Sequence, residues 1–224
     1  MPDPAADAPA TVDLAIAHYR PAPPDAPRRP DVRVGLERGE SALHVRFDVW
    51  DVSLLARRVE HQAMVCRDSC VEFFFEPEAG GAAGYLNLEV NCIGAALLHH
   101  HPTGERNVGE PVDPAVIAAL NIETSLPREP IDPERRGEVS WWVRFAVPFD
   151  AVAGVTGRPV ERVAGPGLSL DWRGNFYKCA DESRHPHWGA WSPITGELDF
   201  HRPDCFAAIT FDEAGRFVSD PEPG

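Results

Sequence analysis

The chain has 224 residues, of which 43% are hydrophobic and 25% charged, and its formal net charge is −14 at pH 7. This length is enough for one substantial hydrophobic core. The acidic charge argues against nucleic acids and anionic membrane surfaces as partners, because both require clustered positive charge. A neutral or cationic ligand is favoured over an anionic one. The acidic charge is also explained if it only keeps the protein soluble. The oligomeric state is left open.

The cellular location is predicted from three features of the sequence. No apolar run approaches the length of a membrane span. Residues 1–7 have neither the basic start nor the hydrophobic stretch of a secretory signal. The five cysteines are an odd number without a C-x-x-C pair, which is typical of reduced and mostly buried thiols. We therefore expect a cytoplasmic protein, in which a disulfide between Cys66 and Cys70 is not favoured.

The chain is predicted to have three parts. Residues 1–10 are rich in Ala, Pro and Asp, and residues 21–30 are rich in proline, so we expect a disordered or extended N-terminal segment over residues 1–30. Within it, residues 12–19 could form an edge strand. A single domain is expected over residues 31–214, followed by a C-terminal tail over residues 215–224.

Alternating apolar and polar residues dominate the predicted domain. The period of two, typical of half-buried strands, occurs in residues 43–50, 71–76, 139–147 and 168–173. Only residues 114–119 and 149–155 suggest helices, and both are short. The pattern predicts an all-β protein: an antiparallel two-sheet β-sandwich, jelly-roll-like, with one or two short helices.

One predicted strand, residues 85–93, has an unusual polar face. Its apolar face carries Leu86, Leu88, Val90 and Cys92. Its other face presents, at intervals of roughly 7 Å, an aromatic, two amides and a carboxylate: Tyr85, Asn87, Glu89 and Asn91. Such a row suits the hydroxyl groups of a ligand, because amides donate and accept while the carboxylate accepts. A solvated strand face is the open alternative.

Residues 171–206 concentrate the remaining candidate residues. They hold three of the six tryptophans, three of the nine histidines and two of the five cysteines, without a helical apolar period. We predict loops lining a cleft rather than a core element; a large ordered loop pinned by its own aromatics is the alternative. The candidate ligand-binding residues here are Lys178, His185, His187, Trp188, Phe200, His201 and Arg202.

Enzyme motifs are absent from the sequence: there is no nucleophile elbow, phosphate loop or metalloprotease helix. Glu72 and Glu89 lie on neighbouring predicted strands and could face each other like the carboxylates of a glycosidase, but sheets often carry such pairs. Asp68 and Glu72 are better explained as a structural pair that neutralises Arg67 or Arg202. No catalytic residue is therefore predicted. Whether the protein is an enzyme is left open, and a non-catalytic role is favoured.

A metal site is a further alternative. His185 and His187 are two residues apart, so in an extended segment they point the same way, with His201, Cys179 or Cys205 as further zinc ligands. Their spacing is not that of a closed zinc site, and we predict no cofactor. The triplet His99, His100 and His101 is interpreted as polar surface residues of a loop.

Several segments together resemble one known family. They are residues 43–51, 68–75, 142–148, 191–192 and 202–209, including Asp68-Ser69-Cys70-Val71-Glu72. The chain from about residue 32 to residue 211 is similar to family 9 carbohydrate-binding modules and their DOMON-type relatives. Residues 175–179 and 186–188 look like a standalone bacterial branch of that family.

The resemblance implies a sugar held between two aromatic side chains. The first would fall on Met64 or Val65, which are not aromatic, and the second is Phe200. Calcium bound by Asp68 and Glu72 is possible by this resemblance. Related DOMON cytochromes hold haem between a methionine and a histidine, here Met64 with His185, His187 or His201; a lone methionine more often fills a core gap, so haem is not favoured.

The function expected from this resemblance is non-catalytic carbohydrate binding, with a role in carbohydrate catabolism or glycan recognition and a saccharide as partner. Trp188 and Phe200 would stack on the sugar, and Asn87, Glu89, Asn91, Lys178 and Arg202 would bond its hydroxyls. Tyr85, His185, His187 and His201 would complete the site, whereas Trp191 is assigned to packing. The alternatives are a haem- or metal-binding DOMON-type domain, or an accessory or interaction protein of a glycoside hydrolase.

Overall fold

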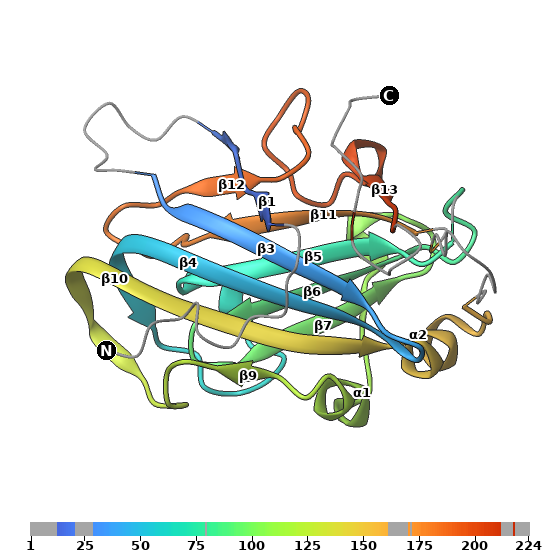
Figure 1. The fold of residues 1–224 in the computed structure, drawn as a ribbon, viewed down its shortest axis with the longest axis horizontal. Helices are drawn as coiled ribbons and strands as arrows, with labels where there is room; N and C mark the ends of the chain where they lie inside the picture. Colours follow the sequence, from blue (N-terminus) through green and yellow to red (C-terminus); the bar gives the residue numbers. More distant parts are fainter. Residues whose placement is uncertain are drawn as a thin grey trace.

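The computed structural model describes residues 13–20, 29–78, 80–160, 170 and 172–211, together with residue 217. Two antiparallel sheets pack face to face (Figure 1). The smaller sheet has the order β1-β3-β4-β10-β9 and comprises β1 (Asp13–Ala15), β3 (Asp31–Arg38), β4 (Ala42–Ala56), β10 (Ile131–Pro148) and β9 (Glu123–Thr124). This is the predicted all-β sandwich.

The larger sheet has eight strands in the order β2-β12-β11-β5-β6-β7-β8, with β13 also pairing β11. Its strands are β2 (His18–Tyr19), β12 (Trp188–Ala190), β11 (Trp172–Cys179), β5 (Cys70–Glu76), β6 (Tyr85–Asn91), β7 (Ala96–His101), β8 (Glu110–Pro111) and β13 (Ala207–Ile209). The 3₁₀ turns η1 (Val65–Arg67), η2 (Arg106–Val108) and η3 (Pro203–Cys205) lie in the connections.

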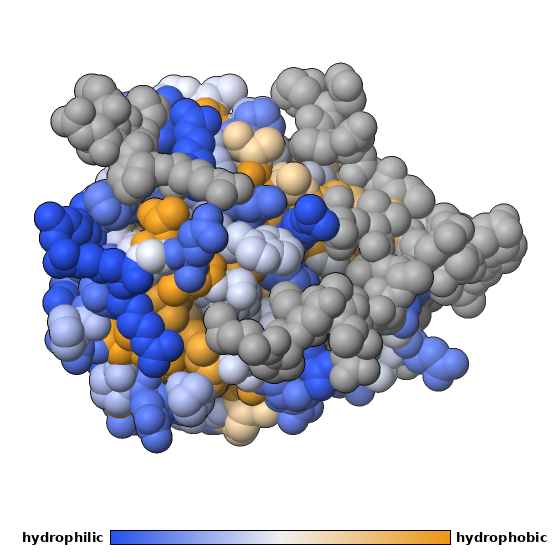
Figure 2. All heavy atoms as spheres, turned by 60° about the vertical axis from the view of Figure 1, so that its left-hand side comes forward, coloured by the Kyte–Doolittle hydropathy of each residue, from blue (hydrophilic) through white to orange (hydrophobic). Residues whose placement is uncertain are grey.

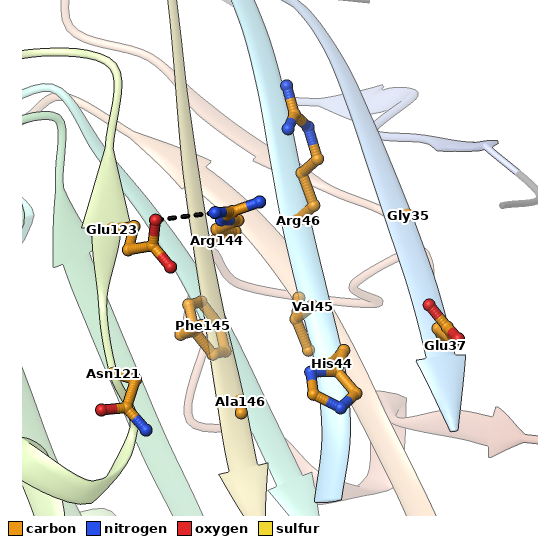
Figure 3. Close-up of a pocket in the computed structure, with 10 residues that line it drawn as sticks. All are labelled: Gly35, Glu37, His44, Val45, Arg46, Asn121, Glu123, Arg144, Phe145 and Ala146. Carbon is orange, nitrogen blue, oxygen red and sulfur yellow. Dashed lines mark hydrogen bonds and ion pairs between the residues drawn. The ribbon is translucent and has the colours of Figure 1, made fainter. Parts of the chain in front are cut away.

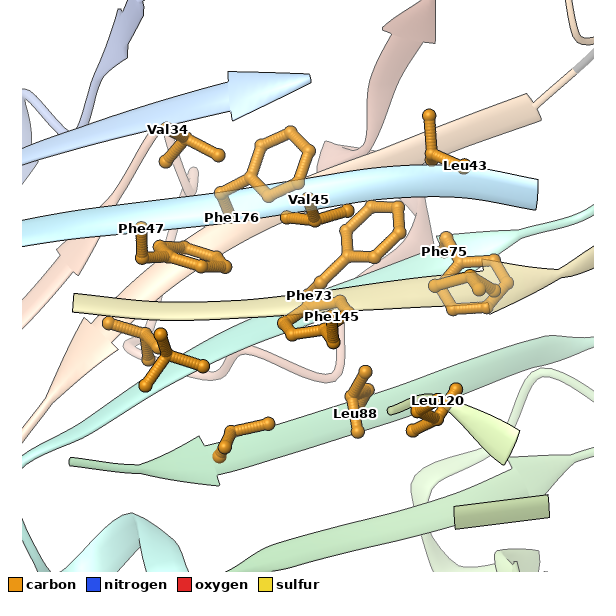
Figure 4. Packing of buried hydrophobic residues seen from close by; sticks show 14 of the residues in the cluster. Val34, Leu43, Val45, Phe47, Phe73, Phe75, Leu88, Leu120, Phe145 and Phe176 are labelled. Atoms are coloured by element: carbon orange, nitrogen blue, oxygen red, sulfur yellow. The ribbon is translucent and has the colours of Figure 1, made fainter. Parts of the chain in front are cut away.

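The core lies between the two sheets and is rich in aromatic rings (Figure 4). Phe73 of β5 stacks on Phe176 of β11, with ring centroids 4.7 Å apart, and on Phe75, at 4.6 Å. Phe47 of β4 reaches across from the smaller sheet to Phe176, at 6.0 Å. These residues occupy alternate positions of their strands, so the same period of two that predicted the strands also places their apolar side chains in the core.

The two predicted helices are both present. Helix α1 (Pro114–Ala119) begins after Asp113, whose side chain accepts a hydrogen bond from the backbone amide of Ala115. Helix α2 (Phe149–Thr156) ends at Gly157, which adopts φ 69°, the left-handed conformation that glycine accepts at low cost. Neither described α-helix has the length and apolar character that crossing a membrane would require.

Two sequence predictions are wrong. Residues 174–179 are not a cleft loop: they belong to β11, which pairs with β5 from Arg173 to Cys179 and supplies Trp172 and Phe176 to the core. His101 is not a surface loop residue either, because it ends β7 and is buried. Val12 and residues 168, 169 and 171 of two predicted strands lie outside the described residues, and the domain boundaries at residues 30 and 214 stay predictions.

The surface mixes polar and apolar atoms. On the side shown in Figure 2, hydrophobic atoms reach the surface between hydrophilic side chains. Among the described residues, four large hydrophobic side chains are exposed: Trp50, Met64, Val108 and Leu198. Scattered apolar residues of this kind are usual, so their position relative to a hollow decides whether they matter.

Candidate functional site

A hollow of about 300 Å³ opens on the outer face of the larger sheet, the face turned away from the smaller sheet. It is lined by Met64, Cys66, Glu72, Phe74, Glu89, Arg106, Cys179, Asp181, Trp188, Leu198, Asp199, Phe200 and His201. Two of the four exposed large hydrophobic residues, Met64 and Leu198, belong to this set. The hollow therefore gathers apolar surface and carboxylates in one place.

The floor of the hollow is built by three neighbouring strands. In β5, Glu72 and Phe74 alternate with the core residue Phe73, so they point outward. Glu89 of β6 is the register partner of Glu72, which confirms that the two carboxylates face each other across neighbouring strands. Cys179 of β11 lies on the same face, and its Sγ donates to Glu72 Oε1 at 2.9 Å.

Aromatic and apolar side chains from loops form the walls. Phe200 stacks on Tyr177 of β11, with ring centroids 4.0 Å apart and planes 10° from parallel. The Tyr177 hydroxyl donates to the Phe200 carbonyl at 3.1 Å. Tyr177 therefore holds Phe200 by both its ring and its backbone. Trp188 is fixed by its indole N–H, which donates to Asp181 Oδ1 at 2.8 Å. Both predicted stacking residues therefore line the hollow.

The two floor carboxylates are buried without a cation between them. Burial raises the pKa of Glu72 well above its ordinary value, and the neighbouring Glu89 raises it further. Burial also raises the pKa of Glu89 to about 7, while the nearby Asn87 amide and Cys66 act in the opposite direction. Glu89 Oε1 accepts from the Asn87 amide at 3.0 Å. Glu89 Oε2 is buried and has no hydrogen-bond partner among the described residues.

A second polar layer lies beside the carboxylates. The Tyr85 hydroxyl is 2.8 Å from His201 Nδ1, and the Tyr85 ring stacks on His101 at 4.3 Å. His101 Nε2 in turn lies 2.9 Å from Asn87 Oδ1. Burial lowers the pKa of His201 to about 4, so this ring is neutral near pH 7, and its Nδ1 shares a hydrogen bond with the Tyr85 hydroxyl. Tyr85 and Asn87 thus position His201 and Glu89.

Seven of the eleven predicted site residues do not line the hollow: Tyr85 and Asn87 form the second layer, and the other five lie elsewhere. Lys178 points to the inner side of β11, is fully buried and contacts His187 Nε2 at 2.8 Å. Asn91 shares the face of Glu89 but its amide donates to Asp68 at 2.9 Å and to the Arg58 carbonyl. Arg202 forms an ion pair with Asp204 at 2.6 Å. None of the residues Lys178, His185, His187, Asn91 and Arg202 lines the hollow.

The predicted pairing of Asp68 needs correction. Asp68 is fully buried and accepts from the backbone amides of Arg57 and Arg58 and from the Arg58 guanidinium, at 2.9–3.0 Å. Neither Arg67 nor Arg202 neutralises it. Glu72 lies four residues further along the chain, and its Oε1 accepts from the Cys179 thiol. Asp68 is therefore a structural anchor, separate from the carboxylates of the hollow.

Some residues of the hollow were not singled out from the sequence. Phe74 could have been found, because it shares a strand face with Glu72, while Cys179 was considered only as a zinc ligand beside the histidines. Cys66, Leu198 and Asp199 come from connections whose position depends on the tertiary fold, and the local pattern carries no signal for them. The Arg106–Asp199 ion pair, at 2.9 Å, joins two such connections.

A second hollow lies on the outer face of the smaller sheet (Figure 3). Its volume, about 330 Å³, is similar, and its charged residues include Arg144 and Glu123, which pair at 2.7 Å. Arg46 pairs with Asp48 at 2.8 Å. The charges are thus matched within the protein, and this hollow has no counterpart of the buried, unpartnered oxygen of Glu89 among the described residues. The hollow on the larger sheet is the better candidate.

The carboxylate geometry favours binding over hydrolysis. A glycosidase places its two carboxyl groups on either side of the bond it cleaves. Glu72 and Glu89 instead lie side by side in the floor on one sheet face, so a ligand meets both from the same direction. Oxygen acceptors below and aromatic rings at the sides suit a ligand with hydroxyl groups and apolar faces.

Comparisons with known proteins agree with this geometry. A crystal structure of a candidate carbohydrate-binding protein from Bacteroides uniformis matches with 30% sequence identity and a TM-score of 0.74, over 89% of this chain and 85% of that chain. A family 9 carbohydrate-binding module from Caldicellulosiruptor kristjanssonii, in complex with glucose, shares the fold, with 14% identity and a TM-score of 0.56 over 89% of this chain and 83% of that one. No curated protein matches the sequence. The family model for carbohydrate-binding family 9 matches residues 20–211, and the chain belongs to this family.

Proposed function

We propose that this protein binds a saccharide without cleaving it, in the hollow on the outer face of the larger sheet. The observation that carries the proposal is the composition of that hollow: two buried carboxylates in the floor and aromatic rings in the walls. Membership of carbohydrate-binding family 9 and the glucose complex of a structural neighbour support it. All five cysteines are free, which supports a reducing, cytoplasmic location and a role in glycan recognition or catabolism there.

The floor would hold the hydroxyl groups of the sugar. The unpartnered Glu89 Oε2 accepts a hydroxyl proton, which removes the cost of a buried acceptor without a hydrogen bond. Glu72, one strand away, offers a second carboxyl group at the spacing of neighbouring strands. The sugar would therefore contact both through adjacent hydroxyls.

The walls would hold the apolar face of the sugar ring. Phe200 is the aromatic platform, because Tyr177 behind it fixes its orientation before the ligand arrives. Met64 occupies the wall where other family members are expected to have a second aromatic, and its exposed thioether is a flexible apolar surface. Trp188 adds a second ring to the same hollow. Aromatic contacts of this kind are worth on the order of 1 kcal/mol beyond the buried area.

Calorimetric titration against a panel of mono- and oligosaccharides tests the proposal. We expect the parent to bind at least one sugar, and Phe200→Ala to weaken that binding several-fold, corresponding to the loss of about 1 kcal/mol. Glu89→Gln should also weaken it, because hydrogen bonds to a charged acceptor are the stronger kind. Trp50→Ala is the matched control, since Trp50 is an exposed aromatic outside the hollow. Absence of binding across the panel, or equal losses for Phe200→Ala and Trp50→Ala, would contradict the proposal.

A further inference from the structure

A cluster of soft and hard metal ligands lies in the floor of the hollow. Cys70, Glu72 and Cys179 each offer one ligand atom, and these atoms all lie within 4.8 Å of one another. Cys70 and Glu72 are two residues apart on β5 and so share a face, while Cys179 is the register partner of Cys70 on β11. The strands therefore hold all three ligands on rigid, hydrogen-bonded backbone.

We propose that Cys70, Glu72 and Cys179 bind a zinc ion. In a tetrahedral site with bond lengths of about 2.0 Å to oxygen and about 2.3 Å to sulfur, the ligand atoms lie roughly 3.5–3.8 Å apart. The three atoms of the cluster lie within 4.8 Å of one another, and one pair, Cys179 Sγ and Glu72 Oε1, is only 2.9 Å apart, so side-chain rotation has to adjust the spacing in both directions. Glu72 is shared with the proposed sugar site, whereas Cys70 and Cys179 are not assigned to the sugar, and metal binding does not require a bound sugar.

A fourth ligand position is open on the side of the hollow. Glu89 lies opposite Glu72, is only 6% exposed, and has one carboxylate oxygen without a hydrogen-bond partner among the described residues. Cys66 packs against the Cys70–Cys179 pair from the η1 turn and also lines the hollow. Neither belongs to the three mutually close ligand atoms, so one of them would have to move toward the cluster to give four sulfur and oxygen donors, a set that zinc accepts.

A metal ion in the cluster would have to displace protons from its ligands. Burial raises the pKa values of the Cys179 thiol and of the Glu72 carboxyl well above their ordinary values, and that of Cys70 to about 12. Without a cation these groups are therefore held in their neutral forms. A divalent ion among them reverses this preference, because a coordinating thiol loses its proton to the metal.

The sulfur donors decide the class of metal. Thiolates favour zinc over calcium and magnesium, which take oxygen ligands. The histidine set considered from the sequence is not assembled: His187 Nε2 contacts Lys178, and Cys205 has Thr195 as its neighbour, at 3.8 Å. Cys179 thus has different partners from those expected, and they come from β5 rather than from the histidine loop.

Cobalt titration of the reduced, metal-free protein tests the site. Cobalt(II) bound by thiolates gives sulfur-to-metal charge-transfer absorption in the near ultraviolet, so the spectrum reports the ligands directly. We expect one equivalent of cobalt, displaced by one equivalent of zinc, and a melting temperature raised by zinc. Cys179→Ser, Cys70→Ser and the isosteric Glu72→Gln should each weaken binding by on the order of a hundredfold or more, since losing even an outer partner costs 10–100-fold.

Cys205→Ser and Cys92→Ser are the controls, because both replace a buried cysteine outside the cluster. Unchanged cobalt spectra in these two variants, with loss in the other three, support the proposal. Absence of charge-transfer bands in the parent, or bands that Glu72→Gln leaves intact, would overturn it. If a cysteine variant does not fold, the proposal is decided by the cobalt binding of Glu72→Gln and by the rise in the melting temperature of the parent on adding zinc. A sugar titration of the metal-free protein is independent, so failure of one proposal is distinguishable from failure of the other.

Discussion

Lys178 and Cys179 are neighbours on β11, yet they belong to two buried polar clusters on opposite faces of the sheet. Lys178 points inward, where its Nζ contacts His187 Nε2 and the Cys179 carbonyl at 2.8 and 2.9 Å and lies 3.6 Å from Asp51 Oδ2. Cys179 points outward to Glu72 and the hollow. Both side chains are almost fully buried, so burial alone does not separate the clusters.

Charge compensation does separate them. In the inner cluster, the ammonium of Lys178 and the carboxylate of Asp51 are opposite charges, and the pKa of His187, lowered by burial and by Lys178 to about 3, keeps that ring neutral. In the outer cluster, two carboxyl groups and two thiols meet, and among the described residues neither carboxyl group forms an ion pair. The comparison teaches that a cluster of paired opposite charges serves the fold, whereas a cluster of unpaired carboxyl groups beside a hollow is available to a ligand.

The largest effect is expected from removing the cation of the inner cluster. Lys178 is the only lysine of the chain. Lys178→Met keeps the apolar stem but leaves Asp51 buried without its counter-charge, which we expect to lower the free energy of unfolding by about 3–5 kcal/mol. Urea denaturation measures this difference. Adding Asp51→Asn to the variant should recover most of the loss; a single variant as stable as the parent would show that the cluster is not structural.

The burial of Lys178 can also be tested by chemical modification, without a mutation. An amine-reactive acylating reagent should leave Lys178 unmodified in the native chain and modify it after unfolding. Peptide mass spectrometry distinguishes the two states. Rapid acylation under native conditions would mean that the inner cluster is open, and the contrast between the two faces would fail.

Two tryptophans sharpen the comparison between the faces. Trp191 is buried against Phe176 and Phe217, with ring centroids 5.6 and 5.7 Å away, so Trp191→Ala should cost about 3–5 kcal/mol of stability. Trp188, three residues earlier, lines the hollow, and Trp188→Ala should cost less stability while weakening sugar binding several-fold. Thermal unfolding and calorimetry measure the two effects. Equal destabilisation by both variants would contradict the assignment of Trp188 to the ligand face.

A smaller effect is expected from the pH dependence of stability. The pKa of Glu89 is about 7 in the fold against 4.5 for an unburied glutamate, so the folded chain holds this proton over that range and the unfolded chain does not. Stability from this group is therefore complete below pH 4.5 and lost as the pH rises through 7, by on the order of 3 kcal/mol.

The variant Glu89→Gln removes this contribution together with the rise that Glu89 causes in the pKa of Glu72, and both changes act in the same direction. The stability of the variant relative to the parent should rise between pH 4.5 and pH 8, as measured by urea denaturation at both values. A difference that stays constant over this range would show that Glu89 keeps an ordinary pKa in the fold.

Much of the fold, but less of the site, could be predicted from the sequence. The alternation of residues 43–50 and 139–147 predicted the paired strands β4 and β10, because a period of two is a local signal. It also placed Asn87 and Glu89 on one outward face. Strand β11 escaped this reasoning at its C-terminal end, since Lys178 faces inward although it is charged. Its burial depends on Asp51, which is distant in sequence, and no local pattern reports such a partner.

Local sequence patterns could not predict where the loops of the site place their side chains, for a related reason. Trp188 and Phe200 were recognised as candidate platforms by residue type. Their position over Glu72 depends on how residues 188–201 return across β11, where Phe200 meets Tyr177. His185, His187 and Arg202 were also selected by residue type and lie in the same stretch, yet the structure places them outside the hollow. Residue type selected the segment, and only the tertiary contacts separated the two groups.

Hydrogen–deuterium exchange with and without a saturating sugar from the calorimetric panel tests the central claim most directly. The claim is that the ligand face is the outer face of the larger sheet, so sugar should slow exchange in residues 64–66, where Met64 and Cys66 line the hollow, and in residues 198–201, which all line it. Residues 121–123 and 144–146, which line the hollow on the smaller sheet, should exchange unchanged. Protection confined to the smaller sheet would contradict the account.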